Sequence, residues 1–493
     1  MVAHARLFRE RTVQAVDLLR AGQIPSANAL YRSAEPNIEV ALNWQEAQGD
    51  PAQYLEWCSQ ACALQISCGG VRMAIVRLQR AVRIATTDMA SRRYGAWCLN
   101  MLSRALYWSN DTRGAVLALR LCRQRTAGVH DATLQEVICN HYCTLRMAQL
   151  RFRAVSFHID RGSRLNEDSK LPKRLVVLAT HRLTLLMLRG EYRPALAEAE
   201  QALELALVTA DPFFLWWVQH LLVEANVRSG LFHRAQGYAD DCSALQDDDF
   251  GRVLQFAARF MQFALHFESE GYTRALETLD AAGQLCRSEA LPRAIAVVLG
   301  AEFILMETGR AAEVKALLSV DDSTFPFDVE FADFYVQLHC FRFRLLAQRG
   351  RSREALASFE CALFPIRRSR NPLWLSWLVE AVAIVANTGS ERALARQLLQ
   401  QAQKLLADAG IIPSPRQRTA WRRVDALIEQ SPVTRAGRSV DITAPQSLLS
   451  VVNSLEALAK RALIAAKKPQ RTKRAPSRKP LETLNVQRSA GLV

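Results

Sequence analysis

Apolar residues recur along this chain at helical spacing, and the apolar segments come in pairs that repeat about every 40 residues. In the full pattern a glycine or small residue is followed by an aromatic or apolar residue two positions later, then by alanine after three and a small residue after seven more; several copies match it only in part. Gly190, Tyr192, Ala195 and Ala202 form the best copy. With the second position as anchor, the pattern returns at 71, 112, 152, 192, 232, 272, 311, 352 and 391. A further copy, offset by a longer insertion, has its anchor at Ile24.

The pattern predicts a helical hairpin: an apolar helix that ends at glycine, followed by a second, amphipathic helix. One hairpin cannot bury its apolar face alone, so neighbours must stack. We therefore expect an all-α fold, a right-handed α-solenoid of nine to ten hairpins. The predicted divisions are N-terminal helices over 1–55, the solenoid over 56–410, capping helices over 411–466 and a disordered tail over 467–493.

The repeat resembles the tetratricopeptide family, whose core positions match Gly190, Tyr192, Ala195 and Ala202. The long period is similar to that of sensor solenoids in large bacterial ATPase regulators. A second likeness to those regulators lies at their junction between ATPase and solenoid, and its matching positions are Glu35, Asn37, Ile38, Ala41, Leu42, Trp44, Gly49 and Asp50. The sequence contains no phosphate-binding loop and no segment resembling their helix-turn-helix domain.

Composition narrows the class of protein. Glycine and proline supply only 38 of 493 residues, which disfavours an all-β protein, and half of the residues are hydrophobic, which excludes a wholly disordered chain. The 11 cysteines are scattered through apolar stretches and the chain starts without a secretory leader, so we expect a cytoplasmic protein with buried thiols. Residues 371–390 carry one charge, Glu380, and we expect a buried helix there, with no membrane span.

Almost half of the net charge of +15 comes from seven cations near the C-terminus. Three prolines prevent a continuous helix there, so a mobile arm is expected. It either binds nucleic acid or another anionic surface, or only keeps the protein in solution. Its cations are Lys467, Lys468, Arg471, Lys473, Arg474, Arg478 and Lys479.

The sequence offers no catalytic motif. It has no His-Glu-x-x-His and no Gly-x-Ser-x-Gly elbow, and the cysteine pairs Cys58/Cys62 and Cys139/Cys143 are expected in the core. We therefore predict no enzyme activity, no metal and no cofactor.

Candidate groove residues follow from the tetratricopeptide resemblance, which implies that first helices line the concave face. Positions about 12 and eight residues before an anchor would then face a ligand. Asn100, Arg104 and Asn140 resemble a set that clamps a peptide carboxylate, with Tyr107 beside them; the alternative is an ordinary solvated face. The remaining candidates are Thr144, His220, Glu224 and Arg344.

Three functions stay open at this point. The first is a regulatory or sensor solenoid that binds a protein, peptide or small effector in its groove. The second is an assembly adaptor that joins proteins of a larger machine. The third is binding of nucleic acid or an anionic surface through the basic tail.

Overall fold

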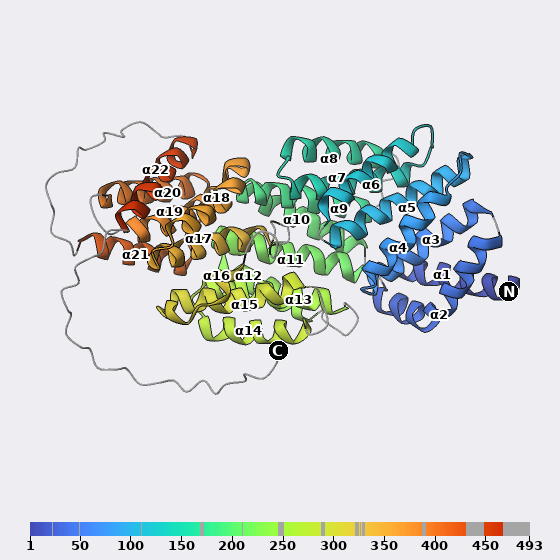
Figure 1. The fold of residues 1–493 in the computed structure, drawn as a ribbon, viewed down its shortest axis with the longest axis horizontal. Coiled ribbons are helices and arrows are strands. Elements are labelled where there is room, and N and C mark those ends of the chain that lie inside the picture. The colour runs from blue at the N-terminus through green and yellow to red at the C-terminus, as the bar shows by residue number, and fades with distance from the viewer. Residues whose placement is uncertain are drawn as a thin grey trace.

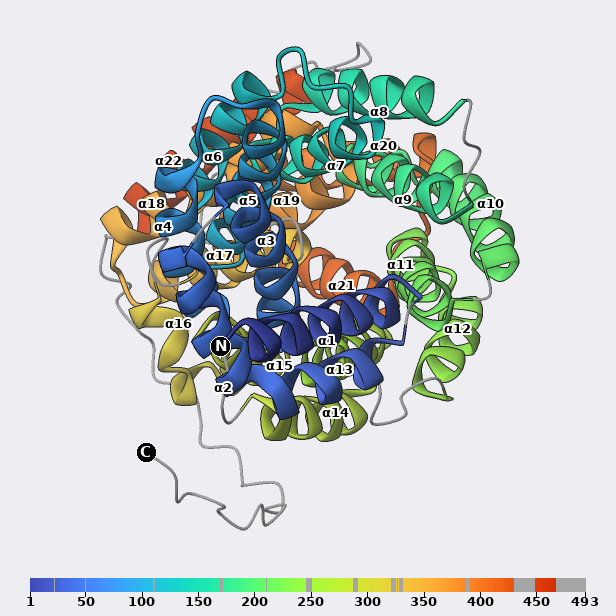
Figure 2. The ribbon, with the colours of Figure 1, turned by 90° about the vertical axis from the view of Figure 1, so that its right-hand side faces the viewer.

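The computed structural model describes residues 1–21, 23–48, 50–109, 111–167, 172–209, 211–244, 251–286, 291–320, 325, 327, 331–386, 391–429 and 448–466. These residues form 22 α-helices and no strand, so the all-α prediction is confirmed. Consecutive helices pack as antiparallel pairs (Figure 1). In Figure 2 the chain runs clockwise as it recedes from the viewer, which makes the superhelix right-handed.

The first helix of each hairpin lies in the inner layer and the second in the outer layer (Figure 2). The first helices are α1 (Val2–Arg20), α3 (Pro51–Ser67), α5 (Met89–Trp108), α7 (Ala132–Ala148), α9 (Pro172–Leu188), α11 (Pro212–Ser229), α13 (Gly251–Glu268), α15 (Leu291–Glu307), α17 (Ala332–Gln348) and α19 (Pro372–Ala386). The second helices are α2 (Ile24–Gln48), α4 (Val71–Ile84), α6 (Thr112–Arg125), α8 (Phe152–Asn166), α10 (Tyr192–Thr209), α12 (Phe232–Ala244), α14 (Tyr272–Leu285), α18 (Ser352–Ser369) and α20 (Arg392–Asp408).

The 40-residue register coincides with the helix boundaries. Most anchors are the first residue of a second helix, as at Thr112, Phe152 and Tyr192. The position two residues earlier has a left-handed backbone, with φ of 72° at Gly190 and 78° at Gly230. This conformation turns the chain from one helix into the next and favours glycine, which has no Cβ.

The eighth unit departs from the prediction of a regular hairpin. A second helix should start at Ala311, but only a 3₁₀ turn (Ala311–Glu313) and the short helix α16 (Ala316–Ser319) form there. The carboxylate of Glu302 accepts hydrogen bonds from the backbone amides of Lys315, Ala316 and Leu317 at 2.6–2.7 Å. Those bonds cap a new helix start and so end the turn at 311–313.

Successive turns of the superhelix contact one another. The corner between α9 and α10 packs against the link between α18 and α19, where the side chain of Asn371 reaches the carbonyl of Met187 at 3.1 Å. Likewise the amide of Ile412 donates to the carbonyl of Ser229 at 3.2 Å. These contacts close the solenoid on itself.

Two further helices, α21 (Pro415–Glu429) and α22 (Leu448–Ala466), follow the last hairpin. Helix α22 packs against α18, α19 and α20, while α21 also contacts α13 from much earlier in the chain. Helix α19, from the segment with the single charge Glu380, lies buried in the protein. Among the described helices none is both long and apolar enough to cross a bilayer.

Candidate functional site

Polar side chains lie on four consecutive first helices, the helices of the inner layer. Arg104 comes from α5, His141 from α7, His181 from α9 and His220 from α11. His141 and His181 each stand eleven residues before their anchors, Phe152 and Tyr192, so the repeat places them at equivalent points. The arrangement forms a ladder with one cation at its N-terminal end. We call these four residues the inner ladder.

Arg104 is the fixed charge of the inner ladder. Its guanidinium lies 4.8 Å from the ring centroid of Trp108, and no described acidic side chain pairs with it. The residue is exposed, yet the surrounding protein lowers the pKa of its guanidinium by desolvation. Both observations fit a position on the inner wall, where water reaches the group but protein surrounds it.

The three histidines of the inner ladder are kept neutral. Burial, together with the charge of Arg104 and of His181, lowers the pKa of His141 to about 3. Burial alone lowers the pKa of His181 and of His220 to about 4. A neutral imidazole both donates and accepts hydrogen bonds, so the ladder offers mixed polar groups beside one permanent positive charge.

Several buried amide atoms near the inner ladder have no hydrogen-bond partner among the residues that the structure describes. They are Oδ1 and Nδ2 of Asn100 and Oδ1 of Asn140. Orphaned polar atoms are costly in a protein interior, and water or a ligand group satisfies them. Thr144 is less available, because its hydroxyl lies 3.4 Å from the carbonyl of Asn140.

The structure separates the residues expected in the groove. Arg104, Asn140, Tyr107 and His220 remain partly or well exposed, but Asn100 is fully buried, so its expected exposure is wrong. Glu224 forms an ion pair with Arg228 on its own helix. Arg344 is buried and pairs with Glu307 at 2.9 Å, so neither charge faces a ligand. The distance of a residue from its repeat anchor could not predict these ion pairs, because it does not reveal whether a charged side chain has a partner.

His141 and His181 were missed as members of the wall. The signal was present in the sequence, since the two histidines are 40 residues apart, as the repeat requires. Their helices, α7 and α9, pack together, so the two side chains share one surface.

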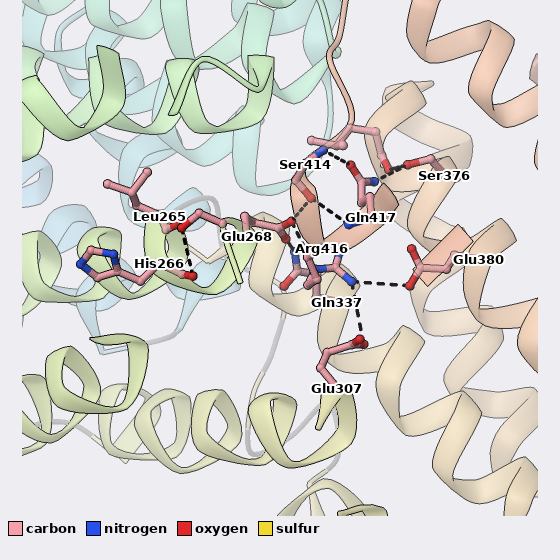
Figure 3. Close-up of polar contacts among 12 residues, drawn as sticks. Leu265, His266, Glu268, Glu307, Gln337, Ser376, Glu380, Ser414, Arg416 and Gln417 are labelled. Carbon is pink, nitrogen blue, oxygen red and sulfur yellow. Dashed lines mark hydrogen bonds and ion pairs between the residues drawn. The ribbon is translucent and has the colours of Figure 1, made fainter. Parts of the chain in front are cut away.

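The inner wall of the C-terminal half is occupied by the chain itself. Arg416, at the start of α21, places its guanidinium 3.2 Å from Glu268, 3.5 Å from Glu380 and 3.9 Å from Glu307 (Figure 3). These glutamates belong to α13, α19 and α15, so one arginine joins three inner helices. Ser414 adds a hydrogen bond to Glu268 at 2.6 Å.

The buried glutamates around Arg416 differ in ionisation. Burial raises the pKa of Glu307, but Arg344 and Arg416 outweigh it and leave that pKa below its ordinary value. Burial dominates at Glu380 and raises its pKa to about 7. One carboxyl of this cluster therefore titrates near neutral pH.

A small cavity of about 70 Å³ lies beside the Arg416 cluster. Phenylalanines of α13 and α17 form much of its wall, and Glu224, Arg228 and Asp333 lie at its polar side. It has room for a few water molecules.

The cysteines lie mainly in the core, as thiols. All 11 cysteines are free thiols; nine are buried and two partly buried. In the described part of the chain no group of three or more His, Cys, Asp or Glu is arranged to hold a metal ion. The tail cations, Lys467 to Lys479, lie outside the described residues.

No family model matches the chain, and no curated protein matches it. Among solved structures it is similar to the Rap protein complexed with competence and sporulation factor, at 13% identity over 82% of this chain and 99% of that one, with a TM-score of 0.46. It is also similar to NprR in complex with its cognate peptide NprX, at 13% identity, 64% and 93% coverage and a TM-score of 0.46. A third is a tetratricopeptide repeat protein from Parabacteroides merdae, at 13% identity, 60% and 98% coverage and a TM-score of 0.38.

One of these three structures is a tetratricopeptide repeat protein. At such identities and TM-scores they carry no inference about what this chain binds. They do not bear on the likeness to the sensor solenoids of ATPase regulators, which stays a prediction.

Proposed function

We propose that this protein is a non-catalytic regulatory solenoid that binds an acidic peptide end or a small anionic effector on the inner wall of its N-terminal half. The observation that carries the proposal is Arg104, a wall cation without an acidic partner among the described residues. An arginine fork recognises a carboxylate or phosphate through two parallel hydrogen bonds.

The neighbours of Arg104 suit the same ligand. Asn140, on the next inner helix, supplies an amide, and His141 supplies an imidazole close enough to feel the charge of Arg104. A bound anion would raise the pKa of His141, because an opposite charge favours the protonated form. Affinity for an anion should therefore increase as pH falls toward the raised pKa of His141.

The inner wall of the C-terminal half is already occupied by α21, which supports a binding site in the N-terminal half. Arg416 of α21 already fills the acidic inner surface made by Glu268, Glu307 and Glu380. A ligand there would have to displace a buried ion cluster, which is costly. The inner wall of α5 to α11 has no such internal occupant among the described residues.

Isothermal titration with a short polyglutamate peptide bearing a free carboxylate tests the proposal. We expect Arg104→Ala to weaken binding by about 1.5–3 kcal/mol, the range for a charge-assisted hydrogen bond. Arg353→Ala is the matched control, since Arg353 is an exposed arginine on the outer helix α18. An amidated polyglutamine of equal length should not bind.

Equal binding by the wild type and Arg104→Ala would contradict the proposal. Absence of any anion binding, together with a protein partner that is retained by both variants in a pull-down, would favour the assembly adaptor.

A further inference from the structure

The outer helices α4, α6 and α8 carry 11 arginines and a single acid, Asp160. Four of these arginines have partners: Arg77 and Arg80 pair with glutamates of α2, Arg125 donates to the carbonyl of Val82, and Arg161 donates to Gln135. The other seven are exposed, and no described acid pairs with them. They are Arg72, Arg83, Arg113, Arg120, Arg123, Arg153 and Arg164.

Large apolar side chains are exposed on the same three helices. Val76, Leu117 and Phe157 are 62%, 58% and 53% exposed, and each stands five residues after the anchor of its repeat. One helical turn earlier on the same face, each helix carries an arginine: Arg72, Arg113 and Arg153. Met73 and Leu121 are also exposed on this surface. The 40-residue repeat thus generates parallel rows of arginine and apolar side chains.

The three helices are neighbours in the outer layer (Figure 2). Arg125 of α6 reaches the carbonyl of Val82 in α4 at 3.3 Å. Burial and the charge of Arg146 are the largest causes of the low pKa of His158 in α8. The charge of Arg123 in α6 lowers this pKa further. The rows therefore form one continuous surface, which we call the outer basic face.

Acidic helices bound the outer basic face on both sides. Helix α2 carries glutamates, two of which neutralise arginines of α4, and α10 carries Glu198, Glu200 and Glu204. The basic face therefore ends at an acidic helix on each side.

We infer that the outer basic face binds the surface of an anionic lipid bilayer. The excess of unpaired guanidinium groups complements phosphate headgroups, with which arginine forms bidentate contacts. The apolar side chains project singly between arginines, and an interface of headgroups and acyl chains accommodates such separate anchors. Nucleic acid matches the charge but offers no environment for Met73, Val76 and Leu117. This inference is independent of the proposed inner-wall site.

Flotation of the full chain with lipid vesicles tests the inference. We expect the protein to float with vesicles of phosphatidylcholine containing a quarter phosphatidylglycerol, and to stay behind with phosphatidylcholine alone. Charge reversal by Arg113→Glu with Arg153→Glu should weaken binding by at least about ten-fold, because each interfacial arginine contributes to attraction by an anionic surface. Leu117→Ser with Phe157→Ser should also weaken it by about five-fold or more, through loss of apolar insertion.

Matched controls lie at similar positions on distant outer helices. Arg353→Glu changes the same register position in α18, and Leu276→Ser removes an exposed leucine of α14; both should bind as the wild type does. Unchanged melting temperatures would show that the variants stay folded.

Three results would overturn the inference. Equal flotation with neutral vesicles would show that binding does not depend on the charge of the lipid. Flotation that survives both double variants would assign binding to another part of the chain, such as the basic tail. Binding of a DNA duplex that depends on Arg113 and Arg153 but not on Leu117 and Phe157, without flotation, would assign the face to nucleic acid.

Discussion

The side-chain amide of Asn371 donates a hydrogen bond to the hydroxyl of Tyr192 at 3.0 Å, although 179 residues separate the two in sequence. The same amide group reaches the carbonyl of Met187, and the Asn371 oxygen accepts from the amide of Leu373 at 2.9 Å. One buried side chain therefore starts α19 and also joins two turns of the superhelix. The closure of the solenoid depends on such contacts.

Replacement of Asn371 should remove both the cap of α19 and the contact between the two turns. We expect Asn371→Ala to cost about 2–4 kcal/mol, because it removes a helix cap and leaves buried polar groups of the α9–α10 corner unpaired. Asp111→Ala is the control, since Asp111 caps α6 through the amide of Gly114 without a contact between turns. That change should cost about 1 kcal/mol. Urea unfolding measures both, and equal losses would mean that the contact between turns adds no stability.

Two glycines with the same backbone conformation should differ in their tolerance of alanine. Gly230 and Gly350 have φ of 78° and 73°. A Cβ at Gly350 meets open space, whereas one at Gly230 would collide with the backbone carbonyl and side chain of Ile412 in the next turn. We expect Gly350→Ala to cost about 1 kcal/mol, for the strained backbone alone.

Gly230→Ala should cost about 3 kcal/mol or more, because overpacking adds to the same backbone strain. Hydrogen exchange should show the extra loss near 229–232 and 410–414. A similar cost for the two variants would indicate that the turns separate easily.

Glu270 occupies the slot that glycine fills in other repeats, with φ of 64°. Glu270→Gly should stabilise the protein by about 0.5–1 kcal/mol, since it relieves a left-handed non-glycine residue. Leu150 has the same conformation, with φ of 53°, but its side chain is buried. Leu150→Gly should therefore destabilise the protein, because the loss of packing exceeds the relief. Thermal unfolding of the two variants should give shifts of opposite sign.

The repeat could be predicted because it is a local pattern. A glycine or small residue, an aromatic or apolar residue and an alanine at fixed spacing mark the best copies, and the anchors at 112, 152 and 192 are the first residues of second helices. The irregular eighth unit could not be predicted, because its form depends on a buried carboxylate, Glu302, that caps α16 from another helix. Contacts between turns of the superhelix could not be predicted from the sequence either, since they depend on small rotations between neighbouring repeats that add up over many repeats.

The site was predictable in part for the same reason. The 40-residue offset identifies Arg104 on an inner helix, but it does not show that Arg344 is already paired with Glu307. Nor does it show that Arg416, outside the repeat, occupies the acidic surface of the C-terminal half. Local spacing gives the face of a helix, whereas pairing depends on helices far apart in sequence.

The stability of the protein should depend strongly on Arg416 at alkaline pH. It is buried among three glutamates, and its removal leaves Glu268, Glu307 and Glu380 with less positive charge. Loss of one partner from a buried ion pair costs about 3–5 kcal/mol, and we expect Arg416→Gln to fall in this range at pH 8. Arg423→Gln is the control, because Arg423 is half-exposed and lies 3.7 Å from Glu307; it should cost less than about 1 kcal/mol.

The cost of Arg416→Gln should shrink as the pH falls. The pKa of Glu380 is raised to about 7 in the folded wild type, against an ordinary value of 4.5, so the folded state holds a proton that the unfolded state releases between these values. The contribution of Glu380 to the free energy of unfolding of the wild type consequently falls as pH rises from 4.5 to 7. Without Arg416 the carboxyl pKa rises further, and the penalty extends above pH 7. Urea unfolding at pH 5.5 and pH 8 should show a larger difference between variant and wild type at pH 8; an equal difference at both would mean that Glu380 does not titrate in this range.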